Sequence, residues 1–184
     1  MKKKALCFSV IIFMLTITSC SQEKYVGSKH TEGFSLNMEI YDSVEKMTST
    51  SDLIVIASYS APPTEYYEKD DETGFELYST RYILHIEKVL KGDLEEGNEI
   101  LFSQMGKPGI DEYETKIKQD KKYILFLAQK TLTDEAVYDA NGIEQGILEI
   151  NENNRLYSYF DEGVMPEYDG EKLSKLEAEI NKKL

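Results

Sequence analysis

Few side chains in this sequence are of the types that carry out acid–base, nucleophilic or metal chemistry. The 184 residues include two histidines and two cysteines. His85 falls in a strand-like stretch, on the side that also carries Arg81 and Glu87, because alternate residues of a strand share one face. An imidazole held in this way could act as a base or a ligand. Because no partner histidine is evident, we favour the interpretation that His85 is an exposed or half-buried strand residue paired with a neighbouring carboxylate.

A second candidate is an acidic cluster in the segment 61–74, which contains two prolines and is predicted to be a loop. Carboxylate oxygens suit Ca²⁺, which is a hard cation. The positions of glycine and glutamate do not match an EF-hand loop, so we favour a solvated acidic loop and leave Ca²⁺ binding by residues 68–72 open. The cluster consists of Glu68, Asp70, Asp71 and Glu72.

The sequence contains none of the short motifs that mark common catalytic sites. There is no Gly-x-Ser-x-Gly elbow, no His-Glu-x-x-His helix, no phosphate-binding glycine loop and no Cys-x-x-Cys pair. We therefore predict no catalytic residue, no metal and no cofactor. Two carboxylates brought together by the fold would leave no such local signature, so an enzyme that uses paired carboxylates stays open.

Tyrosine is unusually frequent, with thirteen tyrosines and no tryptophan. Tyr66 and Tyr67 fall in the predicted loop, where core packing does not require them. Exposed tyrosines combine apolar contact area with a hydrogen-bonding tip and are common at interfaces. We hypothesise that Tyr66 and Tyr67 form a ligand- or partner-binding surface. The alternative is that these tyrosines cover strand edges.

The N-terminus has the composition of an export signal. Three lysines precede a mostly apolar stretch of 14 residues, Ala5 to Thr18, which is shorter than the about 20 residues that span a bilayer. The segment Ile17-Thr18-Ser19-Cys20 resembles the lipobox of bacterial lipoproteins. The resemblance implies that residues 1–19 are a signal peptide and that Cys20 receives a diacylglyceryl group, with palmitate among the acyl chains. An ordinary secretory signal with a chance cysteine is the alternative.

Charge and cysteine content limit the possible partners and the means of stabilisation. The net charge is −13, and removal of a leader with three lysines would leave 18 basic and 34 acidic side chains, a net charge of −16. Such a surface repels phosphates, so we expect no nucleic-acid partner. Cys7 would leave with the leader, so the remaining chain could form no intrachain disulfide and must rely on its core.

The rest of the chain is predicted to be a tether followed by one β-rich domain. Residues 20–35 are polar and indicate a flexible tether, and residues 36–184 indicate a domain with short strands at the spacing typical of a barrel or sandwich. Asn141-Gly142 is typical of a hairpin turn. The predicted strands are 53–57, 75–90, 99–103, 122–128, a weak one at 132–138, 147–150 and 156–160.

Two helices are predicted at the ends of this domain. Residues 42–50 form a short helix that Asp42 caps, with Glu45 in capping-box position. Residues 171–184 form an amphipathic helix that is expected to pack its apolar stripe on the barrel. The stripe consists of Leu173, Leu176, Ile180 and Leu184.

Three segments carry a resemblance that covers roughly residues 50–130. They are Ser51-Asp52-Leu53-Ile54-Val55, then Ile86-Glu87-Lys88-Val89-Leu90-Lys91-Gly92-Asp93, then Lys121-Lys122-Tyr123-Ile124-Leu125-Phe126-Leu127. They resemble uncharacterised cell-surface lipoproteins of Gram-positive bacteria with an OB-like barrel, and distantly the netrin and tissue-inhibitor-of-metalloproteinase barrel. The resemblance implies a mainly β (α+β) fold: a small OB-like antiparallel barrel with a short N-terminal helix and a C-terminal amphipathic helix. The inhibitors' zinc-binding N-terminal cysteine does not carry over, since Cys20 is expected to be acylated and the framework disulfides are absent.

These observations predict a lipid-anchored protein on the extracytoplasmic face of the cell membrane. The leading hypothesis is a non-enzymatic binding module of the cell envelope, held to the membrane through Cys20, with a protein or cell-envelope ligand. One alternative is an envelope hydrolase with paired carboxylates. The other is a structural or assembly lipoprotein that docks through its C-terminal helix.

Overall fold

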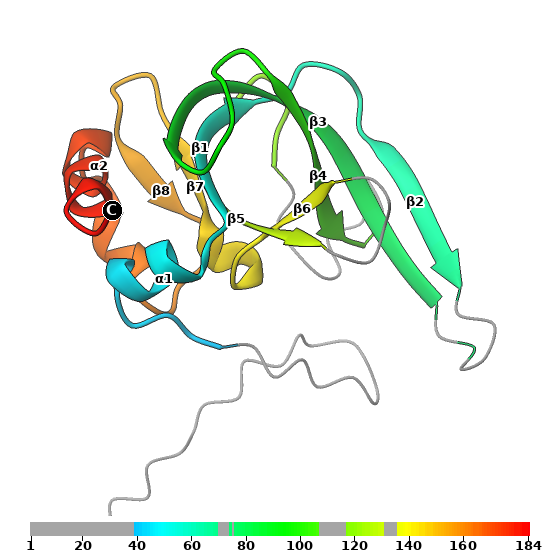
Figure 1. Cartoon of the computed structure of the whole chain (residues 1–184), viewed down its shortest axis with the longest axis horizontal. Coiled ribbons are helices and arrows are strands. Elements are labelled where there is room, and N and C mark those ends of the chain that lie inside the picture. The colour runs from blue at the N-terminus through cyan, green and yellow to red at the C-terminus, as the bar shows by residue number, and fades with distance from the viewer. Residues whose placement is uncertain (1–38, 70–73, 75, 107–116, 131–135) are drawn as a thin grey trace, which may run out of the picture.

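The computed structural model describes residues 39–69, 74, 76–106, 117–130 and 136–184 (Figure 1). The predicted leader and tether, including Cys20, lie outside the described residues. The described chain is mainly β, with two α-helices and two short 3₁₀ helices. Its elements are α1 (Val44–Thr50), β1 (Leu53–Ser58), β2 (Thr64–Lys69), β3 (Glu76–Lys91), β4 (Glu99–Met105), β5 (Lys122–Lys130), β6 (Val137–Ala140), η1 (Ile143–Gly146), β7 (Ile147–Ile150), β8 (Leu156–Ser158), η2 (Met165–Tyr168) and α2 (Leu173–Asn181).

Five strands close into a barrel. The sheet runs β1-β3-β4-β6-β5, and β5 pairs back onto β1. Counted along the chain, the barrel strands therefore follow the order 1-2-3-5-4, which is OB-like. The pairs are antiparallel except for β4 with β6, which is parallel. The OB-like barrel and its two flanking helices confirm the predicted fold class.

Strands β1 and β5 are buried on both of their faces. Leu53, Val55 and Ala57 point into the barrel, and Ile54 and Ile56 point outward beneath the helices. Strand β5 alternates in the same way, with Tyr123, Leu125 and Leu127 inside and Ile124 and Phe126 outside. A strand covered on both sides needs apolar residues at every position, which accounts for the two continuous apolar runs.

The long strand β3 takes part in two structures. Its C-terminal half lies in the barrel, with Tyr82, Leu84 and Ile86 in the interior as the predicted alternation requires. Its N-terminal half pairs with β2 and extends beyond the barrel as a two-stranded arm (Figure 1). The prediction of a continuous loop over 61–74 is therefore wrong at Thr64–Lys69, where threonine and two tyrosines favour a strand once β3 offers its edge.

Helix α1 ends next to the Lys91-Gly92 turn, which belongs to one of the three segments that carry the resemblance. The predicted cap was wrong by one residue, because the Ser43 hydroxyl rather than Asp42 accepts the Lys46 amide at 3.3 Å. At the other end, the Lys91 ammonium donates to the carbonyls of Thr48 at 2.8 Å and Ser51 at 2.6 Å. Gly92 follows with a φ of +106°, and an added Cβ would lie 2.7 Å from Leu53 Cδ1. The lysine–glycine turn thus has a structural role: it fastens the helix to the barrel.

The predicted hairpin at Asn141-Gly142 does not form. Strands β6 and β7 both pair with β5, one beyond the other on the same edge, and η1 connects them. Gly142 has a φ of +67°, but the next residue with a positive φ is Ile143 rather than Asn141, so the backbone differs from the predicted hairpin turn. A true hairpin joins β7 to β8 through the predicted Asn153-Asn154 turn.

Helix α2 covers the outer face of the barrel beside α1 (Figure 1). Leu176 and Ile180 are fully buried in the outer core, whereas Leu184 lies beyond the helix and is 61% exposed. The predicted stripe therefore packs as expected except at its last residue. Neither helix of the described chain has the length and apolarity that crossing a bilayer demands.

Candidate binding surface

The two tyrosines predicted to form a surface lie on opposite faces of the β2–β3 arm. Tyr67 is opposite Tyr78 in the register, and their ring centroids are 4.8 Å apart. This face continues the interior side of the barrel. Tyr66 instead lies on the outer side, where its ring contacts Arg81. The two residues therefore cannot form one surface together.

Tyr66 and Arg81 form a stacked pair on the outer side. The Arg81 guanidinium carbon lies 3.4 Å from the Tyr66 ring centroid, the geometry of a cation–π contact. Both side chains are half-buried. Stacking holds the guanidinium in place while the edge of its planar fork remains available for hydrogen bonds.

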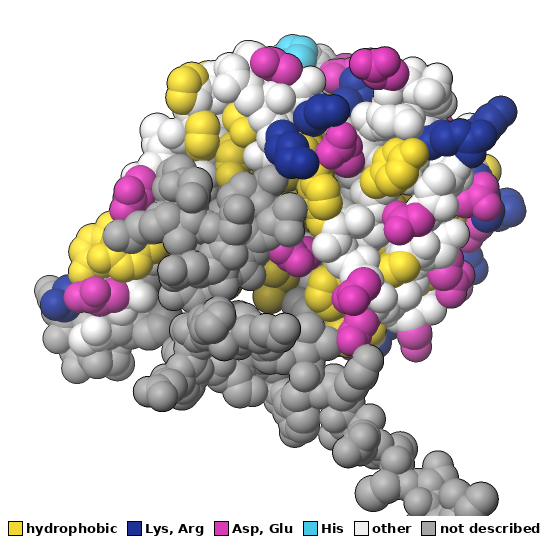
Figure 2. Space-filling model, turned by 180° about the vertical axis from the view of Figure 1, so that it is seen from behind, with side chains coloured by type: hydrophobic (Ala, Val, Ile, Leu, Met, Phe, Trp, Pro, Cys, Tyr) yellow, Lys and Arg dark blue, Asp and Glu magenta, His cyan; other side chains and the backbone are white. Residues whose placement is uncertain are grey.

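The stacked pair borders a sheet face that carries neither helix. Helices α1 and α2 pack over β1, β5 and β7, on the side of the barrel away from the arm (Figure 1). The outer residues of β3 next to the arm are Arg81, Ile83 and His85, and Ile83 is 54% exposed. Figure 2 shows the molecule from behind, with acidic, basic and hydrophobic side chains intermixed on the surface. We refer to the outer side of β3 from Arg81 to His85, which neither α1 nor α2 covers, as the uncovered face.

A small pocket opens beside this face. Its volume is about 100 Å³, well below the several hundred that enclose a drug-sized ligand, so it could hold one small side chain. The pocket is lined by Ser103, Gln104, Met105, Asp139, Ala140 and Ile143.

The other predicted candidates do not assemble into a site in the part of the chain that is described. His85 is exposed on β3, and its neighbours in the register are Ser58 and Glu99, consistent with the simpler interpretation. Asp70, Asp71 and Glu72 lie outside the described residues, and Glu68 is exposed. Among the described residues, no three histidine, cysteine, aspartate or glutamate side chains are grouped so as to hold a metal ion.

Several tyrosines instead close one end of the barrel. Tyr59 packs edge-on against Tyr82 at 4.9 Å, and its hydroxyl donates to the Ile117 carbonyl at 3.0 Å. The Tyr123 hydroxyl lies 3.2 Å from that of Tyr159, which donates to Glu149 at 2.6 Å. These tyrosines therefore serve barrel packing, a role that differs both from the predicted binding surface and from the covering of strand edges.

The pKa shifts of Tyr159 and Glu149 favour a structural role for this pair over proton transfer. Burial raises the pKa of Tyr159 far above its usual range, and the hydrogen bond to Glu149 raises it further. Partial burial acts to raise the pKa of Glu149, but hydrogen bonds from Tyr159 and Lys121 outweigh it and the pKa is lowered. A phenol that stays protonated and a carboxylate that stays charged are fixed hydrogen-bonding partners near neutral pH.

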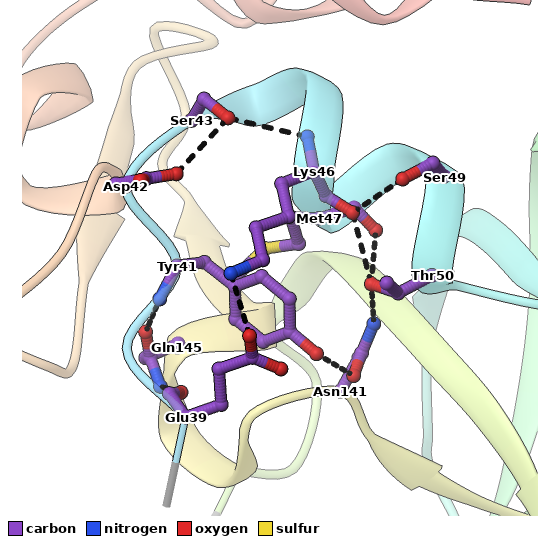
Figure 3. Close-up of polar contacts among 10 residues, drawn as sticks. All are labelled: Glu39, Tyr41, Asp42, Ser43, Lys46, Met47, Ser49, Thr50, Asn141 and Gln145. Atoms are coloured by element: carbon purple, nitrogen blue, oxygen red, sulfur yellow. Dashed lines mark hydrogen bonds and ion pairs between the residues drawn. The ribbon is translucent and has the colours of Figure 1, made fainter.

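A polar cluster that sequence reasoning missed holds the N-terminal segment of the domain (Figure 3). Gln145, 1% exposed, accepts the Tyr41 amide at 2.9 Å and donates to the Glu39 carbonyl at 2.9 Å. Asn141 accepts the Tyr41 hydroxyl at 2.8 Å and donates to the Thr50 hydroxyl at 2.8 Å. We call Asn141, Gln145 and their partners the N-terminal latch, because it ties the start of the described chain and α1 to β6 and η1.

No family model matches this sequence, and no curated protein is significantly similar to it.

Proposed function

We propose that this chain is a membrane-anchored lipoprotein of the cell envelope, and that its barrel is a non-enzymatic module that binds a protein or another envelope component. The lipobox-like segment ending at Cys20 supports the anchor. The observation that carries the binding role is the uncovered face, where an exposed Ile83 adjoins the stacked Tyr66–Arg81 pair. The second and third barrel strands, here β3 and β4, are also where OB-folds receive ligands, which is support by analogy.

The Tyr159–Glu149 pair does not have the pKa shift that a hydrolase with paired carboxylates needs. An enzyme with paired carboxylates needs one carboxyl group with a raised pKa to donate a proton. Burial raises the pKa of Glu149, but its hydrogen bonds prevail and lower it, and its partner Tyr159 is held protonated. This pair therefore supports a structural role for the groups around it.

The packing of α2 favours the uncovered face over the C-terminal helix as the docking surface. Leu176 and Ile180 are fully buried within the chain's own core. A partner that docked on this stripe would first have to displace the helix, at the cost of the outer core. The uncovered face needs no such rearrangement.

The anchor is tested by replacing the acceptor residue. Cys20→Ser should abolish incorporation of radiolabelled palmitate and move the protein out of the membrane fraction. If Cys20→Ser stayed in the membrane fraction without releasing soluble protein, the anchor would have to lie elsewhere. The matched control is Cys7→Ser, which should leave both labelling and fractionation unchanged.

The binding role is tested by crosslinking in native membranes. A photoreactive residue at Ile83 on the uncovered face should yield a discrete crosslinked product. The same residue at Tyr157, which is 44% exposed on β8, is the control and should not. Equal crosslinking from both positions, or none from either, would argue against the uncovered face as a binding surface.

A further inference from the structure

Strand β2 is the outermost strand of the arm (Figure 1) and, within the part of the chain that the structure describes, it pairs with β3 alone. In an antiparallel pair, every second residue directs its backbone N–H and C=O away from the neighbouring strand. The outer edge of β2 therefore presents backbone donors and acceptors to a further strand. The residues of β2 are exposed except for Tyr66, which is half-buried, so this edge is accessible.

The side chains of β2 are complementary to those of a second copy of β2 that runs in the opposite direction. A two-fold axis at Tyr67 places this residue opposite itself, and it places Glu65 of each copy opposite Lys69 of the other. These three residues alternate along the strand and so lie on one face of the sheet, as directly opposed residues must. The pairing therefore contains two pairs of opposite charge.

Other two-fold registers of this strand lack that complementarity. An axis at Glu65, Glu68 or Lys69 would place like charges directly opposite each other, which is destabilising. An axis at Tyr66 would give no ion pair, and an axis at Thr64 would pair the strand with two prolines, which lack a backbone N–H. Charges on an edge strand commonly discourage pairing. Here they also select one register.

The pairing also covers an aromatic side chain that the single chain leaves open. Tyr67 is 44% exposed, and its ring centroid lies 4.8 Å from that of Tyr78 on β3. Cβ atoms of directly opposed residues are about 4.5–5.5 Å apart, so the two copies of Tyr67 would meet in a row that ends in Tyr78 on each side. Aromatic pairs across strands stabilise a sheet.

Neither the ion pair within the arm nor the position of the barrel prevents this arrangement. Lys69 pairs with Glu76 at 3.4 Å, but an ammonium group has three donors, so it can also pair with Glu65 of the second copy. Thr64 is opposite Arg81 at the barrel end of the arm, and Lys69 is opposite Glu76 at its far end. Antiparallel pairing therefore places the two barrels at opposite ends of the joined arms.

We propose that two copies of this chain pair through β2, antiparallel and centred on Tyr67, so that their arms form one sheet in the order β3-β2-β2-β3. The contact over residues 65–69 is smaller than a stable interface, so it is weak between free molecules. Confinement to a membrane raises the effective concentration of the two copies. This last point rests on the proposed lipid anchor, whereas the register does not.

The overall negative charge of the chain does not prevent the pairing. Two copies, each with a net charge of −13, repel each other at long range. At physiological ionic strength, charges more than about 8 Å apart are largely screened. The directly opposed Glu65 and Lys69 side chains therefore dominate the local interaction.

The test is photocrosslinking between two differently tagged copies of the full chain in native membranes. One copy carries a photoreactive phenylalanine analogue at Tyr67. We expect a product with the mass of two chains, in which mass spectrometry locates the link within residues 65–69 of the second copy. The same analogue at Tyr157 on β8 should give no such product. A link from position 67 to another part of the second copy or to a different protein, or no link, would overturn the proposal.

Charge reversal tests the register. Glu65→Lys in both copies places lysine opposite lysine and should lower the yield roughly fivefold. Lys69→Glu combined with Glu76→Lys retains an opposite-charge pair within each arm and should lower the yield equally. When one copy carries Glu65→Lys and the other carries the combined change, both cross-strand pairs again have opposite charges. The yield should then return to within about twofold of the wild-type value. Absence of recovery would overturn the register.

Glu95→Lys is the matched control for charge. It makes the same change in net charge as Glu65→Lys at an exposed position between β3 and β4, and it should leave the yield unchanged. A loss as large as that of Glu65→Lys would contradict the specific pairing.

Fractionation of Cys20→Ser tests the anchor separately. If the anchor fails while the link from position 67 forms, the proposed anchor falls and the pairing stands. If the anchor holds and no link forms, the pairing alone falls.

Discussion

The outer side of the barrel consists of two regions that differ in how completely they are covered. Over β1, β5 and β7, two helices bury the outward side chains, and Leu176 and Ile180 are inaccessible to solvent. Over the outer side of β3 from Arg81 to His85, neither helix covers the sheet, and Ile83 is 54% exposed, whereas the C-terminal end of β3 contacts α2 through Lys88 and Glu177. The same barrel wall therefore contributes to stability on one side and presents polar and apolar groups on the other.

This difference indicates where substitutions will affect folding and where they will affect binding. On the covered region, side chains are held by the core and by hydrogen bonds that are completed within the chain, as in the N-terminal latch. On the uncovered face, Ile83 is 54% exposed and Arg81 is half-buried, so the core depends little on these side chains. We expect changes in the first region to lower the free energy of unfolding and changes in the second to lower affinity.

The largest effect on stability should come from the outer core. Leu176→Ala removes a fully buried side chain and should lower the free energy of unfolding by about 2–5 kcal/mol, as urea denaturation would measure. Leu184→Ala, at a position that is 61% exposed, is the matched control and should change it by less than about 0.5 kcal/mol. Similar losses for the two variants would contradict the division into regions.

The N-terminal latch should have the next largest effect. Gln145→Ala leaves the buried Tyr41 amide without its acceptor and should cost about 1–3 kcal/mol in the free energy of unfolding. Gln119 also donates to a backbone carbonyl, that of Ser60 at 2.7 Å, but it is exposed. Gln119→Ala should therefore be nearly neutral. If the two glutamine variants unfolded at the same urea concentration, the latch would not be a stabilising feature.

The Glu149–Tyr159 pair should make stability depend on pH at both extremes. The pKa of Glu149 is lower in the folded chain than its usual value of 4.5, so its contribution is present above that pH and is lost as the pH falls below it. The pKa of Tyr159 is raised above 10, so its contribution is present below pH 10 and is lost as the pH rises above it.

Denaturation midpoints across pH 3–6 would measure the acid part of this dependence. Glu149→Gln should flatten the loss of stability at acid pH, whereas Glu95→Gln, at an exposed position, should leave it as in the wild-type protein. An unchanged acid profile in Glu149→Gln would show that the pair does not contribute.

The smallest effects on stability should come from substitutions in the β2–β3 arm. Two such substitutions, at Tyr66 and at Tyr67, should nevertheless differ in their effect on binding. Tyr66→Ser and Tyr67→Ser each remove one aromatic contact and should each cost about 0.5–1.5 kcal/mol. Only Tyr66 supports Arg81, so Tyr66→Ser should reduce crosslinking from position 83 and Tyr67→Ser should not. Equal reductions by the two variants would assign both faces of the arm to the binding surface.

The covered region was easier to predict from the sequence than the uncovered face. Continuous apolar runs marked β1 and β5, since burial on both sides leaves no polar positions, and the period of α2 marked its buried stripe. Strand β2 was missed because two prolines and an acidic cluster surround it, and because its order depends on the distant edge of β3. The contact between Tyr66 and Arg81 has no signal in the sequence, because strand register alone brings these residues together.

The most direct test of the account is the accessibility of single thiols in the native membrane. Because Cys20 is expected to be acylated and Cys7 removed, a cysteine introduced at Ile83 or Tyr157 would be the one free thiol. Both positions are about half exposed, so both variants should react with a maleimide at similar rates after purification. In membranes, Ile83→Cys should react several-fold more slowly and Tyr157→Cys at an unchanged rate. Equal rates for Ile83→Cys in membranes and in the purified state would contradict a binding role for the uncovered face.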